Sequence, residues 1–178
     1  DETMIARVPG TGIRNVQTGP RGGGGSDYDA WATPSGLTSA NNGKSMDPDG
    51  DGLNNLGEFA FDGAALSGVS SGKVVMKKAT IGGKDYLTLT LPVLAGATFN
   101  EDMVSNAVSG VIYRIQGAED LSDFSLEVVE VTGTDAAAIQ ANLPDLTSSA
   151  WTYRSFRPVA DMSLPPKQFL RALANEPQ

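Results

Sequence analysis

Residues 73–91 read KVVMKKATIGGKDYLTLTL, and this stretch decides the fold class. From Tyr86 to Leu91, leucine alternates with tyrosine and threonine, which is the period of a strand that buries one face. Val74 to Ala79 is a second strand-like run, and Gly82-Gly83 between the two runs is typical of a tight hairpin turn. The stretch therefore predicts two antiparallel strands joined by a glycine turn.

Further short segments downstream predict more strands. They have apolar residues at alternate positions and are separated by turns: Val111–Gln116, Leu126–Val131, Trp151–Arg157 and Lys167–Ala174. One helix is expected from Asp135 to Asn142, with Thr134 or Asp135 as its N-cap. Because no strand–helix–strand unit repeats, we expect a mainly β fold, an antiparallel β-sandwich with a short N-terminal helical segment.

Three parts are expected along the chain. Residues 1–25 form an N-terminal arm and glycine-rich hinge, residues 26–66 carry an acidic loop, and residues 67–178 form the β-sandwich domain. Glu2–Val8 alternates loosely and is predicted to be a strand. The run Gly22–Ser26 is interpreted as a natural hinge, with an engineered linker as the alternative.

Two short helical elements are expected around the acidic loop. Ser26 and Asp29 have capping-box spacing, which predicts one or two helical turns that end at Pro34. After the loop, apolar residues between Leu53 and Phe61 predict a short amphipathic helix or turn.

Residues 47–58 read DPDGDGLNNLGE and match the twelve-residue calcium loop of EF-hand type. Calcium prefers about six to eight oxygen ligands, and the loop offers them at the required places: Asp47, Asp49, Asp51, the Leu53 carbonyl, Asn55 and Glu58. Gly52 at the sixth position permits the sharp turn. An acidic turn without metal is the alternative, but its four carboxylates would repel one another. Calcium is therefore the expected cofactor.

The segment Asp47–Ala60 resembles dockerin repeats and thrombospondin type 3 repeats. Asn54 stands where regulatory EF-hands carry the isoleucine that bridges two loops, and a single loop does not imply cohesin docking. More broadly, the motifs DPDGDGLNNLGEFAF, VIYRIQGAEDLSDF and FLRAL resemble, in this order, a recurrent C-terminal module of large secreted bacterial proteins. This resemblance covers residues 28–174 and implies a secreted location and a calcium-stabilised structural role, without naming a ligand.

Composition excludes several classes of function. The chain has no cysteine and no histidine, so it has no thiol nucleophile, no imidazole base and no zinc site of the usual ligands. Its net charge of −8 argues against binding to nucleic acid or anionic lipid. No stretch of about 18 apolar residues predicts a membrane span. The pairs Glu101–Asp102 and Glu119–Asp120 fall in predicted turns, where acids are usually solvated, so we do not expect an enzyme.

Two functions remain. We expect a non-catalytic, calcium-stabilised structural or adhesive subunit of a cell-surface assembly or filament, in which the arm, residues 1–17, pairs with a sheet edge of a neighbour. Its partner would be a second copy or another cell-surface or extracellular-matrix protein. The alternative is a carbohydrate-binding or spacer module of a larger secreted enzyme. For that module four aromatic residues are candidates for stacking on a polysaccharide, although aromatics in such positions more often pack in the core or across strands: Tyr28, Trp31, Trp151 and Tyr153. Either function implies a secreted chain whose signal has been removed.

Overall fold

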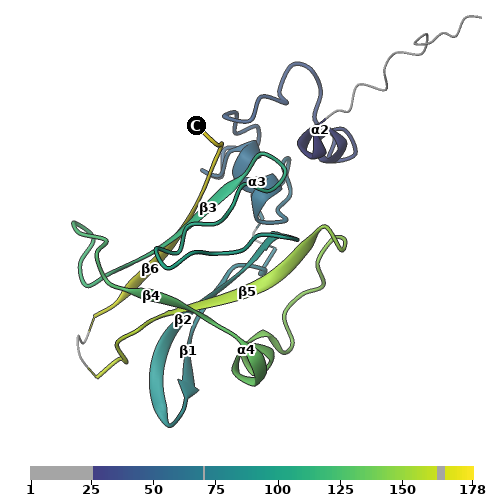
Figure 1. Ribbon diagram of the computed structural model, residues 1–178. Coiled ribbons are helices and arrows are strands. Elements are labelled where there is room, and N and C mark those ends of the chain that lie inside the picture. Colours follow the sequence, from purple (N-terminus) through teal and green to yellow (C-terminus); the bar gives the residue numbers. More distant parts are fainter. Residues whose placement is uncertain (1–25, 70, 164–166) are drawn as a thin grey trace, which may run out of the picture.

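The computed structural model describes residues 26–69, 71–163 and 167–178. The predicted arm strand Glu2–Val8 and the glycine-rich hinge lie outside the described residues. Within the described ranges, six strands form two antiparallel sheets, and three short helices accompany them (Figure 1). None of these helices has the length and apolar character needed to cross a membrane.

The larger sheet has four strands in the order β1–β2–β5–β4. Their bounds are Val75–Ile81 for β1, Lys84–Leu94 for β2, Val128–Val131 for β4 and Trp151–Pro158 for β5. The predicted hairpin is confirmed, because Ile81 pairs with Lys84 across the turn. Gly82 and Gly83 have φ values of 57° and 80°, which glycine adopts at little cost and which match the twist of the flanking strands.

The smaller sheet pairs β3 (Ile112–Ala118) with β6 (Phe169–Asn175). In Figure 1 this pair lies above the four-stranded sheet, and helix α4 lies on the opposite side of that sheet. Apolar side chains from the facing surfaces form one core, with members from both sheets: Leu89, Leu91, Val93, Tyr113, Ile115, Phe156 and Leu170. The mainly β, antiparallel fold predicted from the sequence is confirmed.

Helix α2 (Asp27–Ala32) begins with the predicted capping box, since Ser26 and Asp29 bond to each other's backbone. Helix α4 (Gly133–Gln140) differs from its prediction. Its N-cap is Thr132, so the predicted caps Thr134 and Asp135 are wrong and lie inside the first turn. The reason is that β4 ends at Val131 and the chain turns into the helix directly after one further extended residue.

Helix α3 (Asn55–Ala60) begins within the last turn of the acidic loop and is buried on every side, so its predicted amphipathic character is wrong. The physical reason is that both sheets contact it. Trp151 of β5 donates its indole N–H to the Phe59 carbonyl at 2.8 Å, and Tyr113 of β3 donates its hydroxyl to the Ala60 carbonyl at 2.7 Å. These bonds satisfy two of the carbonyls that a helix C-terminus otherwise leaves unpaired.

Residues 26–66 share the core of the sandwich. Tyr28 and Phe59 meet edge to face, with ring centroids 5.6 Å apart, and Phe59 contacts Trp151 in the same way at 6.1 Å. Two residues after α3, Asp62 accepts a hydrogen bond from Lys73 at 2.6 Å, and both side chains are buried. The acidic loop is therefore anchored directly to the sandwich through the elements that follow it.

Candidate metal centre

The acidic loop curls around the side chain of Asp47. Its two carboxylate oxygens accept hydrogen bonds from the backbone N–H groups of Gly50 and Gly52, at 2.8 and 2.9 Å. Gly50 and Gly52 have φ values of 75° and 96°, a region that a side chain would strain. These backbone bonds lower the pKa of Asp47, so its carboxylate is charged at neutral pH.

Three carboxylates converge inside this curl. Asp47, Asp49 and Asp51 each offer an oxygen within 4.8 Å of the other two. The Asp51 side chain accepts from the N–H of Leu53 at 2.8 Å, which fixes its direction. One Asp49 oxygen, Oδ2, is buried and has no hydrogen-bond partner among the described residues. Carboxylates held this close repel one another strongly, and a cation bound between them would replace this repulsion with attraction.

Backbone hydrogen bonds close the loop at its base. The N–H of Asn55 donates to the Met46 carbonyl at 2.8 Å, and the N–H of Leu56 donates to the Lys44 carbonyl at 2.9 Å. Asn54 caps α3, because its side chain accepts from the N–H of Gly57 at 2.9 Å. The residue at the eighth loop position therefore starts the helix.

The Asn55 side chain is fully buried, and its amide nitrogen and amide oxygen have different surroundings. Its amide nitrogen donates to the carbonyls of Asn41 and Gly43, at 2.8 and 2.9 Å. Its amide oxygen is buried and has no hydrogen-bond partner within residues 26–69, 71–163 and 167–178. Only this oxygen is available as a ligand, and the assignments of Asn55 and of the Leu53 carbonyl to the metal remain predictions.

Glu58 is the fourth acid of the loop, and only 4% of its surface is exposed. Its Oε2 atom is buried and has no partner in the described part of the chain. Burial, and then the charges of Asp51, Asp49 and Asp47, raise the pKa of Glu58 to about 7. Its carboxylate lies outside the tight group formed by the three aspartates, yet close enough to feel the charge of each.

Space for the Glu58 carboxylate depends on Gly63. A Cβ atom at that position would collide with both the carboxylate carbon and Oε2. No local signal in the sequence reveals this role of Gly63. Beyond it, a pocket of about 250 Å³ opens between Glu58, Asp51 and the following segment, including Ala64 and Ser67.

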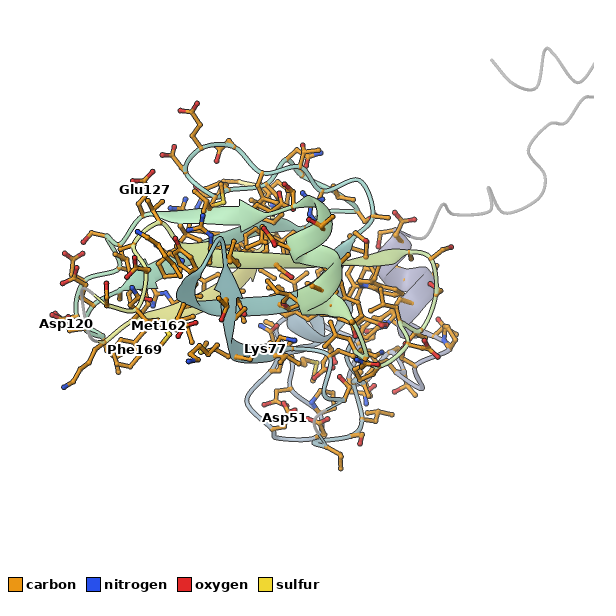
Figure 2. All side chains as sticks on the ribbon, turned by 90° about the horizontal axis from the view of Figure 1, so that it is seen from below. Asp51, Lys77, Asp120, Glu127, Met162 and Phe169 are labelled. Atoms are coloured by element: carbon orange, nitrogen blue, oxygen red, sulfur yellow. The ribbon has the colours of Figure 1, made fainter. Side chains whose placement is uncertain are left out.

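The other candidate residues have different surroundings. Figure 2 shows Asp51 on a loop well separated from the end of the sandwich that carries Asp120 and Phe169. The pairs Glu101–Asp102 and Glu119–Asp120 are exposed in turns. Each of these four carboxylates therefore faces solvent, as the sequence indicated.

Most of the four aromatic residues considered for stacking on a sugar are buried or hydrogen-bonded within the fold. Tyr28 and Trp151 are 3% and 7% exposed, so neither offers a face to a sugar. Tyr153 donates its hydroxyl to the Pro144 carbonyl at 2.8 Å. Trp31 is partly exposed and lines a cleft of about 590 Å³ together with Asp27 and Ser109. Trp31 is thus the aromatic residue of this group that is best placed to meet a ligand.

Comparison of the chain with models of protein families, with curated proteins and with solved structures finds no match. The local geometry of the acidic loop and the architecture around it are therefore the basis for any functional conclusion.

Proposed function

We propose that this protein is a non-catalytic, calcium-stabilised structural subunit of a secreted or cell-surface assembly. One observation carries the proposal. Among the described residues, one buried carboxylate oxygen of Asp49 and one of Glu58 lack hydrogen-bond partners, and both acids belong to a loop in which three aspartates converge. A buried carboxylate without a partner is costly, and a bound cation removes that cost.

Calcium is the cation that suits this set of donors. The loop offers carboxylate, carbonyl and amide oxygens, which hard cations prefer, and the chain contains no nitrogen or sulfur ligand from histidine or cysteine. The ion would be held by Asp47, Asp49, Asp51, the Leu53 carbonyl, Asn55 and Glu58. It would neutralise the carboxylates of the loop and link the loop to α3, and it would take no part in catalysis.

A structural role follows from where Glu58 is anchored. Its helix lies in the core, where side chains of both sheets bond to the helix carbonyls. An ion that joins Glu58 to Asp47 would therefore fix the exposed loop to the core. Sites of this kind in extracellular modules bind calcium with dissociation constants of about 10⁻⁴–10⁻³ M, which suits a secreted location.

Assembly is the second half of the proposal: residues 1–17 would pair with a neighbouring copy of the chain.

The alternative function is a carbohydrate-binding or spacer module of a larger enzyme, and the cleft beside Trp31 supports it. Trp31 lines that cleft together with Asp27 and Ser109, whose hydroxyl donates to the Asp27 carboxylate, so the cleft offers both an aromatic and a polar lining to a saccharide.

Calorimetric titration of the chelator-treated protein with calcium tests the metal site. We expect one ion per chain, and a rise in unfolding temperature because the ion binds only the folded state. At a hundredfold excess over the dissociation constant the stabilisation is about 2.7 kcal/mol, which corresponds to roughly 5–10 °C for a chain of this size.

Two variants and one control complete this test. Asp47→Ala and Glu58→Gln should abolish the calcium-dependent rise. Asp85→Asn, an exposed acid outside the loop, should leave it unchanged. Absence of binding heat and of any melting shift in the unaltered protein would refute the calcium site.

A further inference from the structure

The two sheets of the sandwich differ in width, and this leaves one face of β1 uncovered. Met76 of β1 pairs with Leu89 of β2 and therefore points to the same side, toward the core. Yet Met76 is 50% exposed, whereas Leu89 is 4% exposed. Val74, on the same side, is 53% exposed. The four-stranded sheet thus extends beyond the two-stranded sheet that faces it.

The strand that ends the smaller sheet on this side is β6. It pairs with β3, and its outer edge has no backbone partner among the described residues. The outer edge of β3 is occupied instead, because Ser105 and Leu126 donate backbone hydrogen bonds to it, at 2.9 and 3.0 Å. An added strand therefore has one place in this sheet, beside β6.

Between the edge of β6 and the uncovered face of β1 runs an apolar groove of about 330 Å³. Its walls come from both sheets and from the acidic loop: Leu53, Val74, Met76, Leu89, Leu170 and Ala172. A strand placed beside β6 would satisfy the free N–H and C=O groups of β6. Its inward side chains would cover Val74 and Met76.

We infer that this groove accepts residues Glu2–Val8 of a second copy of the chain as a third strand of the smaller sheet. The inference rests on the assembly half of the proposed function. Glu2–Val8 has seven residues, as does β6. Met4, Ala6 and Val8 alternate with Thr3, Ile5 and Arg7, so the face offered to the groove is apolar from Met4 to Val8, with Glu2 at its end, and the other face is mixed.

Chain length permits a neighbour to supply this strand. Residues 9–25 separate it from α2, and 17 residues span at most about 60 Å when extended. The donor segment and the acceptor groove are different surfaces of one chain. Such a head-to-tail contact forms a filament unless its rotation closes a ring.

The groove also touches the acidic loop. Leu53 is one of the residues that line the groove, and its carbonyl is a predicted calcium ligand. Calcium would therefore hold this part of the groove in place. We expect strand addition to be stronger in calcium than in a chelator.

Cross-linking between neighbouring strands tests the inference, and the cysteine-free chain suits it. Adjacent strands place paired Cα atoms about 4.5–5.5 Å apart, within disulfide range. Leu173 is an exposed residue of β6, 37% accessible, and points away from the core. In the inferred strand, positions 3, 5 and 7 would share the outward side with Leu173. Leu173→Cys is therefore mixed with each of three arm variants, Thr3→Cys, Ile5→Cys and Arg7→Cys, and then oxidised in calcium.

We expect a reducible dimer with at least one arm variant, at a yield at least tenfold above the control. The control acceptor is Ala138→Cys on α4, which packs on the other face of the four-stranded sheet. A synthetic peptide of residues 1–17 in excess should suppress the dimer. The groove variant Met76→Lys should also suppress it, while calorimetry shows unchanged calcium binding.

Three results would overturn the inference. The first is equal cross-linking to the Leu173→Cys and Ala138→Cys acceptors. The second is normal cross-linking in the Met76→Lys variant. The third is a double variant, Ile5→Cys/Leu173→Cys, that forms its disulfide only within one chain. Calcium binding is measured on the same preparations. Loss of the cross-link with intact calcium binding would reject the groove alone, whereas loss of calcium binding would reject the metal site.

Discussion

Two buried carboxylates lie four residues apart in this protein and have opposite surroundings. Asp62 accepts hydrogen bonds from the Lys73 ammonium at 2.6 Å and from the backbone N–H of Thr147 at 2.9 Å. Glu58 faces three other acids, and one of its oxygens has no partner in the described residues. The chain supplies the counter-charge for Asp62 and leaves that of Glu58 to be supplied from solution.

This difference separates a permanent link from a conditional one. The Asp62–Lys73 pair joins the end of the acidic segment to the residues before β1 through two charges that the chain itself supplies. Glu58 stabilises the folded protein only when its negative charge is neutralised, by a cation or by a proton. The following predictions test that distinction, beginning with the largest effect.

Asp62→Ala should destabilise the protein by about 3–5 kcal/mol, because it leaves the buried Lys73 charge without its partner. The loss should be the same in calcium and in chelator, measured by urea denaturation. Asp85→Ala breaks the exposed pair with Lys78 and should cost no more than about 1 kcal/mol. A loss for Asp62→Ala that calcium restores would remove the distinction between the two carboxylates.

The metal-free protein should lose stability as pH rises from 5 to 8. The pKa of Glu58 is raised from 4.5 to about 7 in the folded chain, so the folded state holds a proton that the unfolded state has released. The stabilisation is complete below pH 4.5 and is lost as pH rises through 7. The loss is at most about 3.5 kcal/mol, since one pKa unit corresponds to about 1.4 kcal/mol.

Thermal melts in chelator across this pH range measure the effect, with Glu58→Gln as the control that should flatten the curve. Asp47, Asp85 and Asp161 have lowered pKa values, so their contributions are lost only as pH falls below about 4, outside this window. A pH slope that persists in Glu58→Gln would assign the effect to another group.

Gly63→Ala should destabilise the protein by about 1–3 kcal/mol, because the new methyl group collides with the Glu58 carboxylate. Calcium affinity should fall as well, since Glu58 must move. In a Glu58→Ala background the same substitution should cost little, and the difference is the coupling energy of a double-mutant cycle. Equal costs in both backgrounds would show that Gly63 does not support Glu58.

Local patterns predicted much of the fold and of the candidate site. The alternation from Tyr86 to Leu91 and the Gly82-Gly83 turn are contained in neighbouring residues, and so are the carboxylates and glycines of the acidic loop. The pairing of Asp62 with Lys73 and Thr147 joins residues far apart in sequence. The full burial of α3 and the uncovered face of β1 depend on how the two sheets overlap, which no single segment encodes.

The two carbonyl contacts at the end of α3 give a signature for relatives of this chain. Acidic loops of this type occur in unrelated proteins, so the loop alone identifies little. Here Phe59 and Ala60 are bonded by Trp151 and Tyr113, one from each sheet. Those two aromatic positions are constrained by the helix, and the helix is constrained by the loop. A true relative should therefore combine the Glu-Phe-Ala end of the loop with a later tyrosine and tryptophan on two separate strands.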